Sequence, residues 1–309
     1  MWSHRKNKLI LIILVTAILY LLGTPIQEHK FRNTNLPLGI PPAEWRPLNY
    51  WRNADLQKSL SEKVQTNKRW AALIRKKKMA VGVVDLSHPQ ESIRYASVNG
   101  ETMMYAASLP KIAILLTTCQ AFEDNSLKET SEISDDVKKM IRNSDNRAAT
   151  RMIDRLGFDK IEATLRDSTL KLFDPERGGG LWVGKRYARS GPRHPDPIKG
   201  LSHAANVYQV CRFYYLLATG RLINPSRCNQ MLHMLSNTHL HHKFVNTLDE
   251  IDPEASVYRK SGTWRTWHSD SVLVWGKHKK YILVGLVEDR HGEQILRDLV
   301  NVAENAMYL

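Results

Sequence analysis

The alternation of apolar and polar positions predicts strands near both ends of the chain and helices between them. Residues 53–77 are rich in charge but carry apolar side chains near helical spacing, which predicts an amphipathic helix. The apolar, Val-rich run 79–86 and the more alternating run 91–98 predict two strands joined by a turn at 88–90. Further strands are predicted near the C-terminus, over 256–262, 269–275 and 280–287, before a closing helix over about 292–307.

The central part of the chain is predicted to be mostly helical. An apolar helix follows residue 108 and continues through residue 122. Further helices are expected at about 133–143, 146–156, 159–166, 203–219 and 225–236. Between them, residues 168–201 are rich in Gly, Pro and Arg and predict a long irregular loop.

This order of elements predicts an α+β fold. The simplest arrangement is one antiparallel sheet made from the N- and C-terminal strands, flanked by the terminal helices, with an all-helical lobe inserted between the two groups of strands. Such a fold has its cleft at the boundary between the sheet and the helical lobe, which is a common position for a ligand or active site.

The first residues carry a targeting pattern. Arg5, Lys6 and Lys8 precede an unbroken apolar run over 9–22, which suits either a secretory signal or an uncleaved signal anchor. No small-residue cleavage pattern follows the run, so we favour the anchor. The expected organisation is a cytoplasmic basic head (1–8), a signal anchor or signal peptide (9–26), an extended linker or strap (27–52) and one folded domain (53–309).

Either form of the signal places the folded domain outside the cytoplasm. In a bacterium this means a periplasmic domain held at the inner-membrane lipid by the N-terminal segment, or a secreted protein if the signal is cleaved. The net charge is +14, and a basic helical stretch over 63–78 is interpreted as a solvated face near the membrane. No recognition motif accompanies this charge, so we expect no nucleic-acid partner, and we expect a monomer.

The cysteines and histidines indicate neither a cofactor nor a metal site. Cys119, Cys211 and Cys228 lie in apolar helical patterns without metal-ligand spacing, so three buried thiols are expected. The histidine cluster at 239–242 lacks the helical spacing with an acidic partner that zinc sites use.

The first candidate for chemistry is Ser108-Leu109-Pro110-Lys111, in which serine and lysine are three residues apart. A serine hydroxyl needs a base to act as a nucleophile near neutral pH. If Ser108 begins a helix, Lys111 lies on the same face and points its amine toward the serine oxygen. The N-terminus of that helix would add free N–H groups, which favour a negatively charged oxygen.

Two further motifs lie downstream of this pair. Residues 144–146 (Ser-Asp-Asn) fall between two predicted helices, where their ordinary explanation is a helix N-cap. Residues 260–263 (Lys-Ser-Gly-Thr) end a predicted strand, where their ordinary explanation is a strand-to-turn exit. A glycine there would also let a bound substrate approach the strand closely. Each motif by itself is weak evidence for a site.

Together the three motifs resemble the signature of the class A β-lactamases and the penicillin-binding proteins, which is S-x-x-K, then S-D-N, then K-[ST]-G. All three occur here in that order, on the elements that the family uses: a helix start, an interhelical loop and an edge strand. The flanking sequences 140–156 and 258–263 are also similar to the family. The resemblance covers about residues 55–307 and implies the β-lactamase/transpeptidase-like fold.

The resemblance implies a role for each residue of the first two motifs. Ser108 attacks the acyl carbon of the substrate. Lys111 acts as the general base or holds the proton network. Ser144 relays a proton to the leaving amine, and Asn146 binds the amide side chain of the substrate and helps to orient Lys111.

The third motif is implied to recognise the substrate carboxylate. Lys260 supplies positive potential, and Ser261 donates a hydrogen bond to the carboxylate. Gly262 leaves room for the substrate backbone. The backbone N–H groups of Ser108 and Thr263 would form the oxyanion hole, as preorganised donors do in acyl-transfer enzymes.

The sequence also departs from class A. Those enzymes carry a loop glutamate and, four residues later, an asparagine, which together hold the deacylating water. This chain has Glu176 and Gly180 at the corresponding places, so Glu176 is either a substitute or a surface carboxylate. The interval between Ser108 and Ser144 is short, which predicts a trimmed helical lobe. Arg265, beyond the third motif, is expected at the rim of the cleft, where it could bind a carboxylate.

The resemblance favours a serine hydrolase or acyl-transferase that forms an acyl-enzyme at Ser108 and cleaves the amide of a β-lactam or of a D-alanyl peptide. The alternative enzyme is a D,D-carboxypeptidase or transpeptidase acting on peptidoglycan stem peptides. Without an activated water the acyl-enzyme would persist, which favours a peptidase relative over an efficient β-lactamase. A non-catalytic, membrane-anchored binding protein with the same fold is the alternative of another class, although three complete motifs speak against it.

Overall fold

The computed structural model describes residues 35–89 and 91–308 of the chain. All of these residues belong to one compact unit. The predicted basic head, the predicted signal segment and the first part of the predicted linker lie outside the described residues. Within the described part of the chain, no helix combines the length and the apolar character that crossing a membrane requires.

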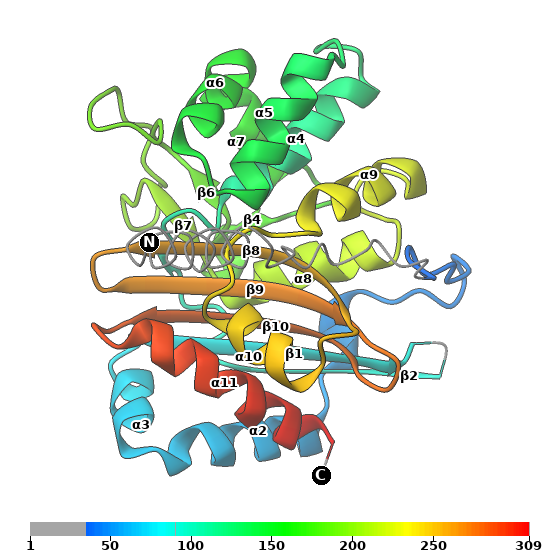
Figure 1. The fold of residues 1–309 in the computed structure, drawn as a ribbon, viewed down its shortest axis with the longest axis vertical. Coiled ribbons are helices and arrows are strands. Elements are labelled where there is room, and N and C mark those ends of the chain that lie inside the picture. Colours follow the sequence, from blue (N-terminus) through cyan, green and yellow to red (C-terminus); the bar gives the residue numbers. More distant parts are fainter. Residues whose placement is uncertain (1–34, 90, 309) are drawn as a thin grey trace, which may run out of the picture. The chain divides into compact units, whose positions relative to one another are not determined.

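A five-stranded antiparallel sheet forms the centre of the fold, as the order of the elements predicted (Figure 1). Its strand order is β2-β1-β10-β9-β8, so N- and C-terminal strands pair through β1 and β10. The strands are β1 (Met79–His88), β2 (Ser92–Val98), β8 (Ser256–Trp264), β9 (Trp267–Trp275) and β10 (Lys280–Glu288).

The apolar run of β1 is explained by burial on both faces of the sheet. Successive side chains of a strand point to opposite faces. Accordingly, Ala80 and Val84 pack into the core on the side of the helical lobe. Val81 and Val83 pack into a second core beneath the terminal helices. Because both faces are covered, this strand shows no alternation between apolar and polar residues.

The terminal helices cover one face of the sheet (Figure 1). They are α2 (Ala54–Thr66), α3 (Lys68–Arg75) and α11 (Gly292–Met307), together with α10 (Phe244–Ile251). The single helix predicted over 53–77 is wrong, because the chain breaks at Asn67. The Asn67 side chain accepts hydrogen bonds from the backbone N–H groups of Arg69 and Trp70, which starts a second helix. Helix α10 was not predicted.

The opposite face of the sheet carries α8 and the helical lobe. Helix α8 packs so closely on β1 that a Cβ added at Gly82 would lie 2.3 Å from a methyl carbon of Val207. The lobe and its neighbours are α4 (Lys111–Glu123), α5 (Ser131–Arg142), α6 (Asn146–Leu156), α7 (Phe158–Arg166), α8 (Val207–Ala218) and α9 (Pro225–Leu235). Cys119, Cys211 and Cys228 are free and buried in these helices, which confirms that prediction.

The long loop predicted over 168–201 contains short ordered elements. They are β4 (Phe173–Asp174), the 3-10 turn η2 (Pro175–Arg177), β5 (Gly179–Gly180) and β6 (Trp182–Val183). Strand β6 pairs with β7 (His203–Ala205), which pairs in turn with β3 (Met104–Tyr105). Residue 203, where a helix was predicted to start, therefore lies in a strand. The small β3-β7-β6 sheet connects the loop to the segment that leads to Ser108.

Residues 35–52 lie as a strap on the folded domain. The backbone N–H of Leu38 donates to the carbonyl of Ala218 at 2.6 Å. The indole N–H of Trp51, in η1 (Leu48–Trp51), donates to the Tyr215 hydroxyl at 3.1 Å. Because Leu38 and Leu48 are buried in the main core, this segment contributes packing energy to the domain.

Candidate active site

Ser108 lies in a tight turn between β3 and α4. The preceding residue, Ala107, has a left-handed backbone (φ 50°), and the Lys111 N–H donates to the Ser108 carbonyl at 3.2 Å. The expectation that Ser108 begins the helix is therefore wrong. Helix α4 begins at Lys111, and residues 108–111 form a turn that leads into it. The Ser108 side chain is half-buried and faces a cavity of about 840 Å³.

The Lys111 side chain is fully buried and hydrogen-bonds to the second motif. Its ammonium nitrogen lies 2.6 Å from the Ser144 carbonyl oxygen, 3.3 Å from the Ser144 hydroxyl and 2.8 Å from Oδ1 of Asn146. It also lies 4.5 Å from the ring centroid of Tyr187, which provides a cation–π contact. These contacts place the amine between the second motif and the Tyr187 ring.

Burial lowers the pKa of Lys111 to about 7, although the nearby Asp145 carboxylate opposes the shift. A charged amine loses favourable hydration when it is buried, so the neutral form becomes accessible. Near neutral pH, Lys111 can therefore accept a proton as well as donate one, which is the condition for a general base.

Ser144 joins the first motif to the third. Its hydroxyl lies 3.3 Å from the Lys111 nitrogen and 2.9 Å from the Lys260 nitrogen. The N-cap of α6 is supplied instead by Asp145, whose side chain accepts from the Ala148 N–H at 2.7 Å. The left-handed backbone at Ser144 (φ 55°) separates the two roles, because it turns the serine away from the helix end.

Lys260 lies in β8 and is almost completely buried. Its nitrogen also donates to the Ser261 carbonyl at 2.7 Å. Burial, together with the neighbouring cations Lys111 and Arg259, holds the pKa of Lys260 well below its usual value. The Ser144 hydroxyl therefore lies between two buried amines, within hydrogen-bond distance of each.

Gly262 brings the end of β8 against the serine turn. A Cβ at this position would lie 2.4 Å from the Ala106 carbonyl oxygen and 2.5 Å from the Ser108 nitrogen. Only glycine permits this approach without displacing the backbone. The strand residue that follows, Thr263, lines the same cavity as Ser108.

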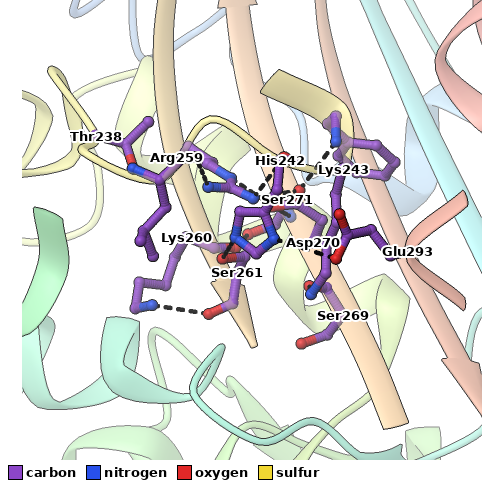
Figure 2. Close-up of polar contacts among 12 residues, drawn as sticks. Thr238, His242, Lys243, Arg259, Lys260, Ser261, Ser269, Asp270, Ser271 and Glu293 are labelled. Atoms are coloured by element: carbon purple, nitrogen blue, oxygen red, sulfur yellow. Dashed lines mark hydrogen bonds and ion pairs between the residues drawn. The ribbon is translucent and has the colours of Figure 1, made fainter. Parts of the chain in front are cut away.

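A buried polar cluster beneath β8 was not found by sequence reasoning (Figure 2). The Lys243 nitrogen donates to the Gly262 carbonyl at 2.6 Å, the Thr263 hydroxyl at 2.8 Å and the Ser269 carbonyl at 3.1 Å. Burial lowers the pKa of Lys243 to about 8, against the opposing effect of Asp270. No local motif marks this lysine, because its partners lie 19 to 26 residues away.

Arg259 and Asp270 form the buried ion pair of this cluster. Two guanidinium nitrogens donate to the carboxylate, at 2.9 and 2.8 Å, and both side chains are excluded from solvent. His242 lies beside the pair, with Nε2 3.5 Å from the Ser261 hydroxyl (Figure 2). Burial and the nearby Arg259 lower the pKa of His242 to about 4, so the ring is neutral at physiological pH.

Tyr187 and His203 form the wall opposite Lys111, and sequence reasoning missed both. The Tyr187 hydroxyl donates to the Ala107 carbonyl at 3.2 Å, and its ring stacks on His203 with a centroid distance of 4.2 Å. Nε2 of His203 donates to the Lys185 carbonyl at 2.9 Å. Burial lowers the pKa of His203 to about 4. The Tyr187 ring, 4.5 Å from the Lys111 nitrogen, is part of the surroundings that bury this amine and lower its pKa.

The remaining predicted site residues differ in whether they line the cavity. Asn146, Thr263 and Arg265 line the cavity, and Ser261 lies buried behind it. Glu176 is exposed in η2 and is not among the cavity-lining residues. Among the described residues, no cluster of three His, Cys, Asp or Glu side chains could hold a metal ion.

Comparison with protein families gives one match. Residues 127–306 match the model of a family described as the beta-lactamase enzyme family. This match covers more than half of the chain and includes the second and third motifs. No curated protein was found to match the sequence.

Several solved structures share the fold. The β-lactamase from Sphaerobacter thermophilus DSM 20745 has a TM-score of 0.61 at 18% identity, over 81% of this chain and 97% of that one. The class A β-lactamase from Mycobacterium abscessus gives 0.60 at 14% identity, over 81% and 100%. A point mutant of PBP-A, described as an acyl-enzyme complex with penicillin G, gives 0.60 at 17%, over 85% and 99%. These likenesses confirm the β-lactamase/transpeptidase-like fold.

Proposed function

The chain belongs to the beta-lactamase enzyme family, and on that premise we propose that it is a serine hydrolase or acyl-transferase that forms an acyl-enzyme at Ser108. Its substrate would be an amide of the β-lactam or D-alanyl peptide type. The observation that carries this proposal is the position of the Ser144 hydroxyl, which lies within 3.3 Å of Lys111 and 2.9 Å of Lys260. Burying two lysines around one serine costs hydration free energy, and such arrangements are concentrated at functional sites.

Acylation follows from the protonation states of the site. The neutral amine of Lys111 takes the proton of the Ser108 hydroxyl as the serine oxygen attacks the acyl carbon. The oxyanion that forms is stabilised by the backbone N–H groups of Ser108 and Thr263, whose close approach Gly262 permits. The proton then passes from Lys111 through the Ser144 hydroxyl to the leaving nitrogen, and the amide bond breaks.

Hydrolysis of the acyl-enzyme is expected to be slow. The residues that line the cavity include no aspartate or glutamate, and Glu176 lies outside it. Without a carboxylate to activate water, an acyl group would remain on Ser108 until another nucleophile reaches it. Among the alternatives, this observation favours a transpeptidase, which passes the acyl group to an amine, over an efficient β-lactamase.

The β-lactam part of the proposal is supported by a structural neighbour. A PBP-A mutant with this fold is described as an acyl-enzyme complex with penicillin G. A penicillin is an amide with a carboxylate beside its reactive ring, which suits a cavity lined by cationic side chains and by no aspartate or glutamate. We extend the same proposal to location: the N-terminal segment would hold the domain in the periplasm at the inner membrane.

A labelling experiment tests the proposed function. The wild-type protein and Ser108→Ala would each be incubated with a fluorescent penicillin and analysed by intact mass. Covalent labelling of the wild type alone, persisting for many minutes, is the expected result. Labelling of both proteins would place the covalent reaction at a residue other than Ser108. Labelling of neither, with penicillins and D-alanyl peptides alike, would rule out acylation and favour the non-catalytic binding protein.

A further inference from the structure

The rim of the cavity above Ser108 carries positive charges that the acylation chemistry does not use. We call Lys185, Arg189, Arg193 and Arg265 the rim cluster; all four line the cavity. Lys185 and Arg193 face each other in an antiparallel bridge, so three members come from one loop, residues 185–193. Arg265 comes from the turn between β8 and β9, where its backbone is left-handed (φ 53°).

The rim cluster has no acidic partner within residues 35–89 and 91–308. The Lys185 nitrogen donates to the Arg189 carbonyl at 3.3 Å, and Arg193 donates to the Gly200 carbonyl at 2.9 Å. By contrast Arg186, on the same loop, pairs with the Asp154 carboxylate at 2.6 Å. No aspartate or glutamate lines the cavity, so the acidic and strongly basic side chains in its lining are all cations.

Such an arrangement favours an anion more strongly than an open surface does. Cavity walls of low dielectric concentrate the field of like charges and raise the local concentration of an oppositely charged ligand. A guanidinium group also matches a carboxylate geometrically, because two parallel N–H donors meet its two oxygens. An anion that enters the cavity therefore gains hydrogen bonds and relieves the repulsion among the four cations.

Aromatic side chains lie beside the rim cluster. Trp264 is 54% exposed, and the Arg265 guanidinium carbon lies 5.6 Å from its ring centroid. Trp267 packs edge-on against Tyr105 at 5.5 Å, and both rings line the cavity. An exposed tryptophan in a cavity wall offers a flat apolar contact. The ligand group that the rim binds is therefore an anion on an apolar body.

The rim cluster and Lys260 lie at different depths. Lys260 is 1% exposed, behind Ser144 and Ser261, whereas Arg189, Arg193 and Arg265 are exposed at the mouth of the cavity. If the substrate carboxylate on the leaving side of the amide lies near Lys260, the cations at the mouth of the cavity are left without a ligand. A ligand that fills both positions would carry two anionic groups.

Building on the proposed acylation of Ser108, we infer that the natural substrate is a dianionic acyl donor. One carboxylate lies toward Lys260 and Ser261, on the leaving side of the amide. The second carboxylate belongs to the acyl half of the substrate and binds the rim cluster, while its apolar body contacts Trp264 and Trp267. The acyl half therefore stays bound at the rim after the amide is cleaved.

Two penicillins that differ by one charge test this inference. Carbenicillin is benzylpenicillin with one added carboxylate on its acyl side chain. At low ionic strength, the second-order rate of Ser108 acylation should be about tenfold higher for carbenicillin than for benzylpenicillin, because the rim attracts the second charge. In the double variant Arg189→Gln/Arg193→Gln the two rates should become equal.

A control double variant removes the same amount of positive charge at a place away from the cavity. Lys76→Gln/Lys77→Gln removes two exposed cations at the end of α3 and should leave the preference for carbenicillin unchanged. An equal loss of preference in both double variants would show that net charge alone attracts the ligand. That result, or a preference that survives in Arg189→Gln/Arg193→Gln, overturns the rim site.

A binding measurement separates this inference from the proposed function. Phenylmalonate and phenylacetate are the acyl side chains of the two penicillins without the reactive ring. In ligand-observed NMR titrations of Ser108→Ala, phenylmalonate should bind more tightly, and the preference should disappear when Arg189→Gln/Arg193→Gln is added. If neither penicillin acylates Ser108 but this preference is present, the acylation proposal fails and the anion site stands. Equal binding of the two acids overturns the site.

Discussion

The ammonium nitrogen of Lys243 lies 2.6 Å from the carbonyl oxygen of Gly262 and 2.8 Å from the hydroxyl of Thr263. The Gly262 carbonyl belongs to the same peptide group as the Thr263 N–H, which faces the cavity in the proposed mechanism. A cation on that oxygen fixes the orientation of the peptide and polarises its N–H, which strengthens the donor. We therefore interpret Lys243 as a positioning residue for the oxyanion hole.

Replacing Lys243 tests this relationship. Lys243→Met should slow acylation of Ser108 by about 10- to 100-fold, because the oxyanion donor is no longer held in place. It should also lower the free energy of unfolding by about 1–3 kcal/mol, since buried carbonyl oxygens lose a donor. Lys243→Arg keeps the charge and should recover part of the rate. Stopped-flow labelling and urea unfolding measure the two effects, and a destabilised Lys243→Met with an unchanged rate would contradict the interpretation.

The pH profile gives a readout that a purely structural lysine would not affect. The pKa of Lys243 is lowered to about 8 by burial, so its ammonium form declines as the pH rises above that value. The acylation rate of the wild type should fall over this range. In Lys243→Arg the side chain stays charged, and the fall should move to higher pH.

Removing the Ser144 hydroxyl should stop the proton transfer without unfolding the chain. Ser144→Ala and Ser144→Gly should both reduce the acylation rate by about 100-fold or more, the usual contribution of acid–base groups. Because Ser144 has a φ of 55°, glycine fits the backbone better than alanine does. Ser144→Gly should therefore be more stable than Ser144→Ala by about 1 kcal/mol. If the acylation rates of the two variants differ in line with their stabilities, although both lack the hydroxyl, the proposed proton relay through Ser144 is contradicted.

Lys111 should set the acidic limb of the pH profile. Its pKa is lowered to about 7, and only the neutral amine can accept the Ser108 proton. The acylation rate should therefore rise as the pH increases through 7, pass through a maximum between pH 7 and 8, and fall as Lys243 loses its proton. Lys111→Arg cannot deprotonate in this range, so it should be slower by about 100-fold or more and show no such rise. A rise that persists in Lys111→Arg would assign the base to another group.

Glu176 should have no part in deacylation. It is exposed and does not line the cavity, so we expect no contact between its carboxylate and a water held beside the acyl group. Glu176→Gln should leave the lifetime of the penicilloyl-enzyme unchanged, as followed by intact mass over several hours. A clearly longer lifetime in the variant would show that the loop moves Glu176 toward Ser108 after acylation.

The Arg259–Asp270 pair should dominate the stability of the sheet edge. Both side chains are buried, so Asp270→Asn leaves a guanidinium without its counter-charge and should cost about 3–5 kcal/mol. Glu132→Gln breaks a pair whose acid is 76% exposed, and it should cost no more than about 1 kcal/mol. Urea unfolding of the two variants checks this contrast. Equal losses would mean that water reaches Asp270.

Local patterns were sufficient for most of the secondary structure. Strands β9 and β10 and helices α6 and α11 occur close to their predicted places, because apolar periodicity reports which face of an element is buried. Asn67 shows the limit of that signal: its side chain caps a new helix inside a run that periodicity reads as continuous. Helix α10 was missed because the short run 244–251 has too few turns to show a period.

The order of the three motifs in the sequence predicted which residues share the cleft, and it also predicted the fold. It did not predict Lys243, Tyr187 or His203, because each contributes through partners that are distant in the sequence. The altered pKa of Lys111 likewise depends on burial, and burial exists only after the lobe, the loop and the sheet have packed together. The sequence by itself thus determined most of the elements and which motifs meet at the cavity. The tertiary structure alone decided their charge states and the positive rim, because electrostatic energy depends on distance and on exclusion of water.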